Sequence, residues 1–398
     1  MSVSLRSERW MLPDGIEEML PEQAMRIQSL RRSILDLFRV WGYDYVIPPM
    51  VEFIDSLLTG TGNETDLRTC KLTDQLTGKT MGVRADITPQ VARIDAHSMQ
   101  RNGVNRLCYS GHVMHARPRG PLASRLPVQA GVEIFGDDSI DADIEVLSLL
   151  ASSLIDSGVK DLHIDLAQVT VFRSLVKHAS LSDQDEVLLR ELVRNRRVAE
   201  LQGWLDERDL NADIKAAFTA LPTFIGGIET LARARPILSK VIEFDPIEKD
   251  LTLCYHTLVS RFPELSLSID LSELRGYSYH TGIVFGAYTG SVGHSLASGG
   301  RYDKVGECFG RARPATGFVI NVSALAKSLA STDENQPSRS DAVFVPAAIA
   351  KSEGNYQLIN ALRQAGRRVV VGLSEQEQPE SYQNCTEVME ADGTIHKL

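Results

Sequence analysis

The pattern of apolar residues changes twice along this chain, and the change constrains the fold more than any other feature. Residues 266–325 alternate as β-strands do, in segments such as SLSIDLSEL, GIVFGAY and ATGFVINV. The stretch before them, 181–250, is instead rich in Leu, Arg and Glu at helical spacing, with a loop at Gly226-Gly227. More strand-like segments precede that stretch. We therefore expect an α+β fold whose strand-rich core carries a helical insertion at about 181–250.

Amphipathic helices are predicted beside these strands. Residues 22–41 place apolar side chains at spacings of three and four, which gathers them on one helical face. Pro21 is suited to start this helix and Gly42 to end it. A second helix is predicted over 141–157, and a strand over 162–166.

Length and patterning indicate more than one domain. The chain has 398 residues, a length that exceeds what one hydrophobic core ordinarily holds. Its composition, 43% apolar and 24% charged, is typical of a globular protein. The polar stretch 330–340 lacks apolar periodicity, so we interpret it as a linker between residues 1–329 and 341–398. The second segment predicts a strand, an amphipathic helix, a strand and one or two further short strands. It is interpreted as a small, truncated α/β domain.

Several functional classes are excluded by what the sequence lacks. No run of about 18 apolar residues predicts a membrane helix, and the first residues show no secretory signal pattern. Five scattered cysteines without a CxxC pair indicate free thiols in a reducing cytoplasm. There is no GxxxxGK[ST] phosphate loop. Cys108, His112 and His115 lack a fourth ligand nearby, so we predict no metal and no cofactor.

The first stretch with chemical character is 97–132, which contains five arginines and no acidic residue in a chain of net charge −10. A guanidinium donates two parallel hydrogen bonds, so this stretch suits a carboxylate or a phosphate, with Arg117 and Arg125 as candidate ligands. The alternative is a solvated basic loop. The next strand favours binding, because alternation places Gln129 and Glu133 on one face, where a buried carboxylate needs a partner.

Three other segments concentrate polar side chains. Arg84, Asp86 and Thr88 alternate, which predicts that they share one face of a strand; the alternative is an exposed polar edge. The segment 274–282, LRGYSYHTG, combines a guanidinium, two phenols and an imidazole, as the wall of a polar pocket would. The segment 299–303, GGRYD, precedes the apolar strand GFVINVSAL, and its glycines permit close approach of a ligand or a neighbouring strand.

In this order, the segments resemble the catalytic core of histidyl-tRNA synthetase, a class II aminoacyl-tRNA synthetase. Residues 42–49 are similar to motif 1, which forms a homodimer interface in that class. Residues 109–136 resemble motif 2, and GGRYD with its following strand resembles motif 3. Residues 60–66 (GTGNETD) and 84–88 resemble the first histidine-binding segment, and RGYSYHTG resembles the histidine-specific RGxxYYTG element. The resemblance covers about residues 10–325. It implies a class II antiparallel sheet flanked by helices.

Carried over by position, the resemblance implies a pocket for L-histidine. Its residues would be Asp86, Thr88, Gln129, Glu133, Arg275, Tyr279 and His280. Asp86 and Gln129 would hold the α-ammonium group. Glu133 and the Tyr279–His280 pair would hold the imidazole. Arg275, with an arginine of the motif 2 loop, would approach the carboxylate, so each charged part of histidine would meet a complementary group.

The nucleotide side departs from the family pattern. The motif 3 strand of the family ends in Glu-Arg-Leu, whose arginine holds ATP, whereas this chain has Ser323-Ala324-Leu325. The motif 2 loop of the family, Phe-Arg-x-Glu-Arg-Pro, is one residue shorter here (114–118, MHARP) and lacks the Glu. His280 stands where the family has Tyr. Each lost transition-state contact costs about 10²–10³ in rate, so we expect no synthetase activity and no catalytic residue.

The RNA-binding side departs as well. The synthetase carries a full α/β anticodon-binding domain, but residues 341–398 are short. They hold five Lys or Arg against eight Asp or Glu, a net charge of −3. A surface that binds RNA must offset phosphate charge, so we expect no tRNA binding.

A synthetase core with these losses resembles a second family, the regulatory subunits of ATP phosphoribosyltransferase. The resemblance implies a non-catalytic subunit that activates a short catalytic subunit in the first step of histidine biosynthesis. It also implies feedback inhibition by L-histidine, self-association through the synthetase-like core, and a hetero-octamer of four subunits of each kind. The alternatives are an active histidyl-tRNA synthetase and a free-standing histidine sensor.

Overall fold

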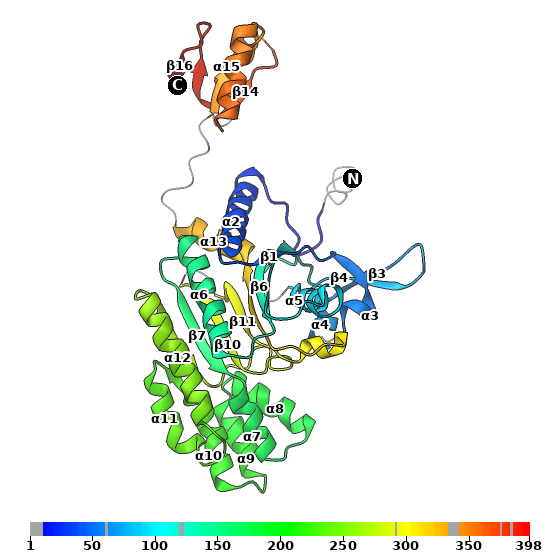
Figure 1. Ribbon diagram of the computed structural model, residues 1–398, viewed down its shortest axis with the longest axis vertical. Helices are drawn as coiled ribbons and strands as arrows, with labels where there is room; N and C mark the ends of the chain where they lie inside the picture. The colour runs from blue at the N-terminus through cyan, green and yellow to red at the C-terminus, as the bar shows by residue number, and fades with distance from the viewer. Residues whose placement is uncertain are drawn as a thin grey trace, which may run out of the picture. The chain divides into compact units, whose positions relative to one another are not determined.

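The computed structural model describes residues 11–59, 63–118, 123–290, 293–332, 342–374, 376–382 and 385–398 (Figure 1). The chain divides into two compact units, Met1–Ser331 and Thr332–Leu398, and each is described by itself. The stretch 330–340, predicted to be a linker, lies mostly outside the described residues.

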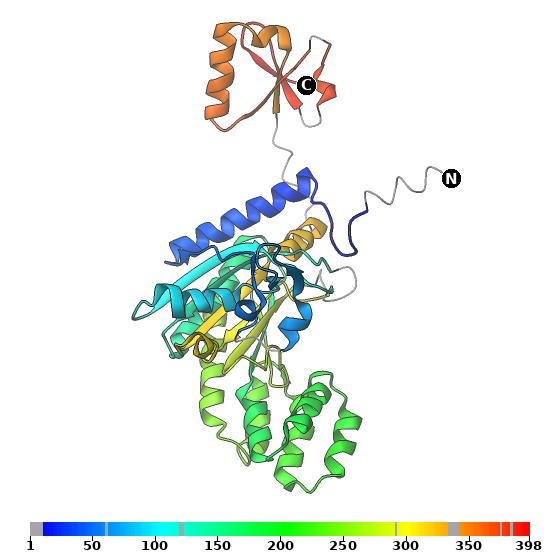
Figure 2. The same ribbon diagram turned by 90° about the vertical axis from the view of Figure 1, so that its right-hand side faces the viewer.

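A nine-stranded sheet forms the centre of the first unit (Figures 1 and 2). Its order is β1-β5-β6-β12-β11-β10-β7-β9-β8, and all neighbours are antiparallel except β1/β5 and β7/β9. The strands are β1 (Asp44–Tyr45), β5 (Asn105–His112), β6 (Val128–Phe135), β7 (His163–Gln168), β8 (Ile225–Gly226), β9 (Ser266–Asp270), β10 (Ile283–Tyr288), β11 (Ala297–Arg301) and β12 (Ala315–Asn321). The predicted antiparallel sheet flanked by helices is confirmed, with two parallel pairs added to it.

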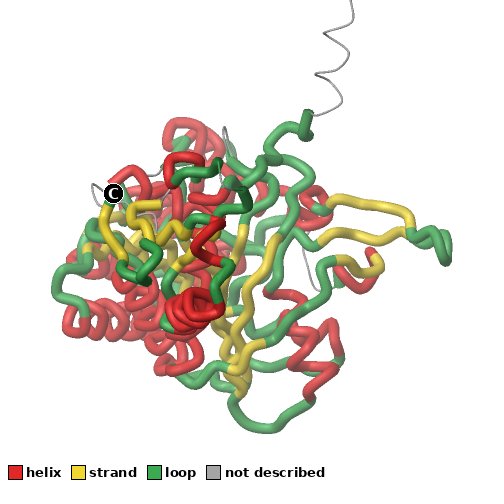
Figure 3. The backbone as a smooth tube through the Cα atoms, turned by 90° about the horizontal axis from the view of Figure 1, so that it is seen from above, coloured by secondary structure: helices red, strands yellow, loops and turns green. Residues whose placement is uncertain are grey.

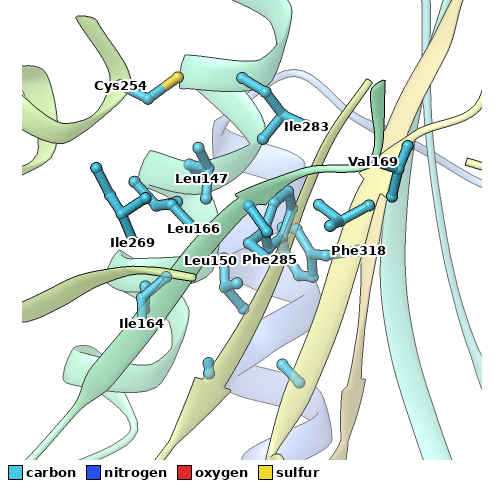
Figure 4. Packing of buried hydrophobic residues seen from close by; sticks show 14 of the residues in the cluster. Leu147, Leu150, Ile164, Leu166, Val169, Cys254, Ile269, Ile283, Phe285 and Phe318 are labelled. Carbon is cyan, nitrogen blue, oxygen red and sulfur yellow. The ribbon is translucent and has the colours of Figure 1, made fainter. Parts of the chain in front are cut away.

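Three helices cover one face of this sheet: α2 (Pro21–Val40), α6 (Ile140–Asp156) and α12 (Asp245–Arg261). Their apolar faces pack on the strands, as Figure 4 shows for Leu147 and Leu150 of α6 beside Leu166 of β7. The prediction for α2 is confirmed to within a residue, because Pro21 occupies its first turn and Gly42 follows it at φ +89°.

Smaller elements complete the first unit. A three-stranded sheet has the order β2-β4-β3, and its β3–β4 hairpin extends away from the main sheet (Figure 3). Its strands are β2 (Val51–Phe53), β3 (Cys70–Thr73) and β4 (Thr80–Val83). The remaining short helices are α3 (Ile54–Leu57), α4 (Asn63–Arg68), α5 (Thr88–Arg93), η2 (Ile94–Met99), α7 (Thr170–His178), η4 (Val305–Phe309) and α13 (Val322–Thr332). Among the described residues, none of the helices has the length and apolar character needed to cross a bilayer.

The stretch 181–250 is helical, as its periodicity predicts (green in Figure 1). Its elements are α8 (Asp183–Arg194), α9 (Val198–Asp206), α10 (Ala212–Ala220), η3 (Leu221–Thr223), α11 (Glu229–Leu238) and the start of α12. The loop predicted at Gly226-Gly227 is partly wrong. Ile225 and Gly226 form β8, which pairs with β9 and extends the main sheet, because Asp270 and Ile269 lie opposite them.

The second unit is a four-stranded sheet of order β14-β13-β15-β16 with helices packed on it. The pairs β13/β14 and β13/β15 are parallel, and β15/β16 is antiparallel. This order follows the predicted strand, helix and strand with two short strands after them. The elements are β13 (Ala342–Val345), α14 (Ala347–Ala350), α15 (Glu353–Gln364), β14 (Arg368–Val371), η5 (Pro379–Ser381), β15 (Cys385–Met389) and β16 (Ile395–Lys397).

Candidate functional site

A cavity of about 620 Å³ lies on the polar face of the main sheet, over β6, β11 and β12. Ala130, Val132 and Ile134 of β6 pack in the helix-covered core, so the alternate residues Gln129 and Glu133 face the cavity. All seven residues predicted to form a histidine pocket line it: Asp86, Thr88, Gln129, Glu133, Arg275, Tyr279 and His280. The volume is within the range of about 300–1,000 Å³ typical of small-molecule sites.

Glu133 is the most deeply buried acid of the cavity, with 1% of its surface exposed. Three hydroxyls donate to its carboxylate: Thr88 (2.8 Å), Tyr109 (3.2 Å) and Tyr302. Burial raises the pKa of Glu133 to about 8, the charge of Asp86 adds to the rise, and the three hydrogen bonds oppose it. The pKa of this carboxyl group therefore lies near neutral pH, so the group can gain or lose a proton when a ligand binds.

Gly317 of β12 makes room for this carboxyl group. A Cβ at position 317 would lie 1.8 Å from Oε2 of Glu133, which no side chain could accommodate. Position 317 therefore requires glycine, because any side chain there would occupy the space that the Glu133 carboxyl group of the neighbouring strand fills.

The prediction that Arg84, Asp86 and Thr88 share a strand face is wrong. Strand β4 ends at Val83, and Thr88 begins α5 with Pro89 in its first turn. Oδ1 of Asp86 accepts from the backbone N–H of Thr88 (3.2 Å), as in an Asx turn. Proline fixes a helical φ but offers no N–H, so it favours a helix start over a continued strand. Asp86 and Thr88 still reach the cavity, whereas Arg84 is buried against backbone carbonyls.

The loop after β9 carries three predicted residues. It turns at Gly276 (φ +60°), where a Cβ would lie 2.5 Å from Nδ1 of His280. Arg275 donates from Nη2 to the hydroxyl of Tyr288 (2.6 Å), and its backbone N–H donates to Glu273 (2.7 Å). The ring of Tyr279 lies 4.2 Å from that of His280, centroid to centroid.

His280 is a neutral hydrogen-bonding group. Burial lowers its pKa to about 4, although the hydrogen bond to the carbonyl of Arg275 opposes the shift. Its Nδ1 lies 3.1 Å from that carbonyl oxygen, which can only accept. The proton of the neutral ring therefore sits on Nδ1, and Nε2 is an acceptor. A histidine at this position offers a ring-nitrogen acceptor, whereas the family's tyrosine has a hydroxyl group that can donate.

Most of the described arginines in the basic stretch 97–132 are paired with other groups of the fold. Arg106 forms a bidentate ion pair with Glu145 (2.7 Å), and Arg101 pairs with Asp44 (3.2 Å). Arg125, predicted to bind an anion, donates to the carbonyls of His115 (2.9 Å) and Asp14 (3.1 Å) and does not line the cavity. That prediction is corrected, since backbone carbonyls already engage its guanidinium.

Arg117 does line the cavity and is the candidate anion ligand that the structure keeps. The neighbouring Arg119 lies outside the described residues, as do the first three residues of the GTGNETD segment. Thr65 of that segment reaches the cavity wall.

The altered motif 3 residue lies in a helix. Strand β12 ends at Asn321, and Ala324 is in the first turn of α13, where its N–H donates to Oδ1 of Asn321 (3.0 Å). Ala324 is 6% exposed and does not line the cavity. The change of this position to alanine thus leaves a small buried side chain and no cation.

Sequence reasoning missed three side chains that line the cavity and a fourth, Tyr109, that is fully buried against Glu133. Tyr109 and Tyr302 donate to Glu133 from β5 and from the end of β11, and their contacts join residues 24 and 169 positions away. Arg68 and Arg194 line the cavity from α4 and α8. Tyr302 belongs to the GGRYD segment, which the sequence analysis had already singled out. In contrast, nothing in the helical pattern around Arg194 indicates a cavity residue.

Fold and cavity together define a class II, histidyl-tRNA synthetase-like protein. The family model of histidyl-tRNA synthetase matches residues 15–325. A histidyl-tRNA synthetase structure from Nostoc has a TM-score of 0.75 at 17% identity, covers 98% of this chain and 96% of its own, and shows the shared fold.

Closer relatives narrow the class. The chain is 47% identical to an ATP phosphoribosyltransferase regulatory subunit of Saccharophagus degradans over 97% of both chains, and 47% identical to one of Teredinibacter turnerae over 96% of both. A structure from Bacillus halodurans described as an ATP phosphoribosyltransferase regulatory subunit/histidyl-tRNA synthetase has a TM-score of 0.81 at 25% identity, over 95% of this chain and 97% of its own. This chain belongs to the family of ATP phosphoribosyltransferase regulatory subunits.

Proposed function

We propose that this chain activates a short ATP phosphoribosyltransferase catalytic subunit and lets L-histidine inhibit the complex, with no synthetase activity of its own. The observation that carries the proposal is the cavity, in which all seven residues expected for histidine recognition come together. The relatives named as regulatory subunits, similar over nearly the whole chain, support the choice of partner.

The amino-acid end of L-histidine fits unpaired polar atoms of the cavity residues. Oε1 of Gln129 and Nη1 of Arg275 are buried and have no hydrogen-bond partner among the described residues. One is an acceptor and the other a cationic donor, so they suit an ammonium and a carboxylate. Asp86 adds the negative charge that an ammonium group needs. A buried polar atom without a partner is unfavourable, and a zwitterionic ligand would satisfy both atoms.

The imidazole end fits Glu133 and the Tyr279–His280 pair. An imidazole can donate to the Glu133 carboxylate from one ring nitrogen, or accept from the protonated carboxyl group. His280 offers an acceptor at Nε2, so it suits a ring N–H of the ligand. This arrangement discriminates against side chains of similar size that cannot both donate and accept hydrogen bonds.

We expect the affinity for L-histidine to be highest between about pH 6.5 and pH 8. The buried Glu133–imidazole pair holds one proton. Above the Glu133 pKa of about 8, neither free group carries that proton, so binding requires proton uptake and weakens as pH rises. Below the ligand's imidazole pKa of about 6.5, both groups carry one, so binding requires proton release and weakens as pH falls. Calorimetric titration across pH 5.5–9 measures the profile.

The control for this profile is Glu133→Gln, which removes the titrating group and keeps the size of the side chain. Its weaker affinity is expected to lose the alkaline limb that Glu133 causes and to retain the acid limb from the ligand. A wild-type affinity that stays constant between pH 7 and pH 9 would contradict the proposed proton sharing.

The alternative of an active synthetase has a direct test. Ala324 supplies no cation for ATP, and the motif 2 loop reaches the cavity with Arg117 but without the family's Glu. We therefore expect the purified chain to show no histidine-dependent exchange of pyrophosphate into ATP above background. An authentic histidyl-tRNA synthetase assayed in parallel is the positive control, and a measurable rate from this chain would overturn the regulatory assignment.

We also propose the assembly that the family implies. Self-association would use the synthetase-like core, and four chains would join four catalytic subunits in a hetero-octamer, without tRNA or membrane. A free-standing histidine sensor remains the other alternative. Affinity capture from the source cell separates the two, because only the proposed assembly retains the catalytic subunit, and the native mass of the captured complex tests the stoichiometry.

A further inference from the structure

Helix α8 of the insertion contacts Tyr277 in the loop that carries Tyr279 and His280. Three of its side chains, at spacings of four, form one row on the helix surface: Glu186, Arg190 and Arg194. Burial raises the pKa of Tyr277 in this loop, and the nearby carboxylate of Glu186 adds to the rise. The guanidinium of Arg190 lies 5.4 Å from the centre of the Tyr277 ring. Arg194, one turn further along, lines the cavity.

Tyr277 also contacts helix α7. Arg173 of α7 lies 4.9 Å from the centre of its ring and donates to its backbone carbonyl (2.8 Å). The ring also packs edge-on against Phe172 (5.4 Å between centroids), and Tyr277 is 5% exposed. A shift of α8 would therefore displace Tyr277, and with it the neighbouring Tyr279 in the cavity wall.

The cavity has more positive than negative side chains. Four arginines and two acids line it: Arg68, Arg117, Arg194, Arg275, Asp86 and Glu133. Nη2 of Arg275 is engaged by Tyr288 (2.6 Å). Arg194 is exposed and has no hydrogen bond or ion pair to any described residue. A guanidinium that is unpaired at a cavity wall is a ready donor pair for a carboxylate.

We propose that Arg194 contacts the carboxylate of the bound amino acid, and that this contact couples occupancy of the cavity to the position of the insertion through the row on α8. The inference rests on the proposed histidine-binding function. Arg194 would thus be a ligand-binding residue within the insertion, and helix α8 would connect the cavity with the other helices of the insertion.

The test compares L-histidine with L-histidinol, which has an alcohol in place of the carboxylate, by calorimetry on the full-length chain with its catalytic partner. Arg194→Gln is expected to weaken L-histidine binding by about tenfold, the low end for a charged hydrogen bond at an exposed arginine, and to leave L-histidinol binding unchanged. The matched control is Arg197→Gln. Arg197 pairs with Glu200 at the surface of the insertion and does not line the cavity, so both affinities should stay at their wild-type values.

A second measurement tests the coupling. Saturating L-histidine is expected to slow amide hydrogen exchange in Asp183–Arg194 of the wild-type protein but not of Arg194→Gln. If Arg194→Gln binds both ligands as the wild type does, or weakens both equally, the inference is wrong while the histidine pocket stands. If the wild-type complex binds no L-histidine, the proposed function itself fails, and this inference fails with it.

Discussion

Glu133→Ala is expected to abolish inhibition of the complex by L-histidine, with affinity reduced about 100-fold or more. The carboxyl group is the central polar group of the cavity, held by Thr88, Tyr109 and Tyr302. The ligand's imidazole loses the partner with which it shares a proton, and a lost charge-assisted hydrogen bond of this kind costs about 1.5–3 kcal/mol. Calorimetry gives the affinity, and the rate of the complex with and without L-histidine gives the inhibition.

The fold should tolerate this substitution. Thr88 and Tyr109 already lie 3.1 Å apart, oxygen to oxygen, so they can bond to each other once the carboxyl group is gone. Removal of a buried acid whose pKa is raised to about 8 also relieves an unfavourable burial. The melting temperature is therefore the control measurement, and Glu200→Ala, at an exposed surface pair, is the control variant. Inhibition that persists in Glu133→Ala would place the histidine site elsewhere.

The parts of this molecule that could be predicted from sequence are those set by residues close together in the chain. Helix α2 follows from apolar spacing between Pro21 and Gly42, and the direction of Glu133 follows from alternation along β6. The cavity residues themselves were predicted through the resemblance to histidyl-tRNA synthetase. Composition and periodicity alone would not have brought β6 and the loop around His280 together.

The errors arose where a local pattern was ambiguous or a partner was distant. Arg84, Asp86 and Thr88 have the period of a strand, but Pro89 starts a helix and the alternation is coincidental. Arg125 was predicted to bind an anion, whereas its guanidinium donates to backbone carbonyl groups up to 111 positions away in sequence. Arg194 reaches the cavity only because the insertion folds back beside the loop at Tyr277. Such long-range contacts leave no periodic signal in the sequence.

Arg301→Met is expected to reduce the free energy of unfolding of the first unit by about 3–5 kcal/mol, because it leaves a buried carboxylate unpaired. Arg301 donates from Nε and Nη2 to Asp143 (2.9 and 2.8 Å), and only 10% and 3% of the two side chains are exposed. It also donates to the carbonyls of Asp137 and Ser139 (3.0 and 2.9 Å). The arginine of the GGRYD segment thus joins β11 to α6. Urea denaturation monitored in the two proteins measures the loss.

The pH dependence of this loss identifies its cause. Burial raises the pKa of Asp143, and Arg301 opposes the rise, so Arg301→Met is expected to raise that pKa further. The folded variant then binds a proton more tightly than the unfolded chain, so its stability deficit should be largest near pH 7 and should shrink as pH falls toward 5.

Adding Asp143→Leu to Arg301→Met is expected to recover part of the stability at pH 7, since an apolar pair needs no counter-charge. Arg101→Met, at an ion pair that is mostly solvent-exposed, is the matched control and should change little. A deficit that is independent of pH and is not relieved by Asp143→Leu would mean that lost packing, and not an unpaired carboxylate, destabilises the variant.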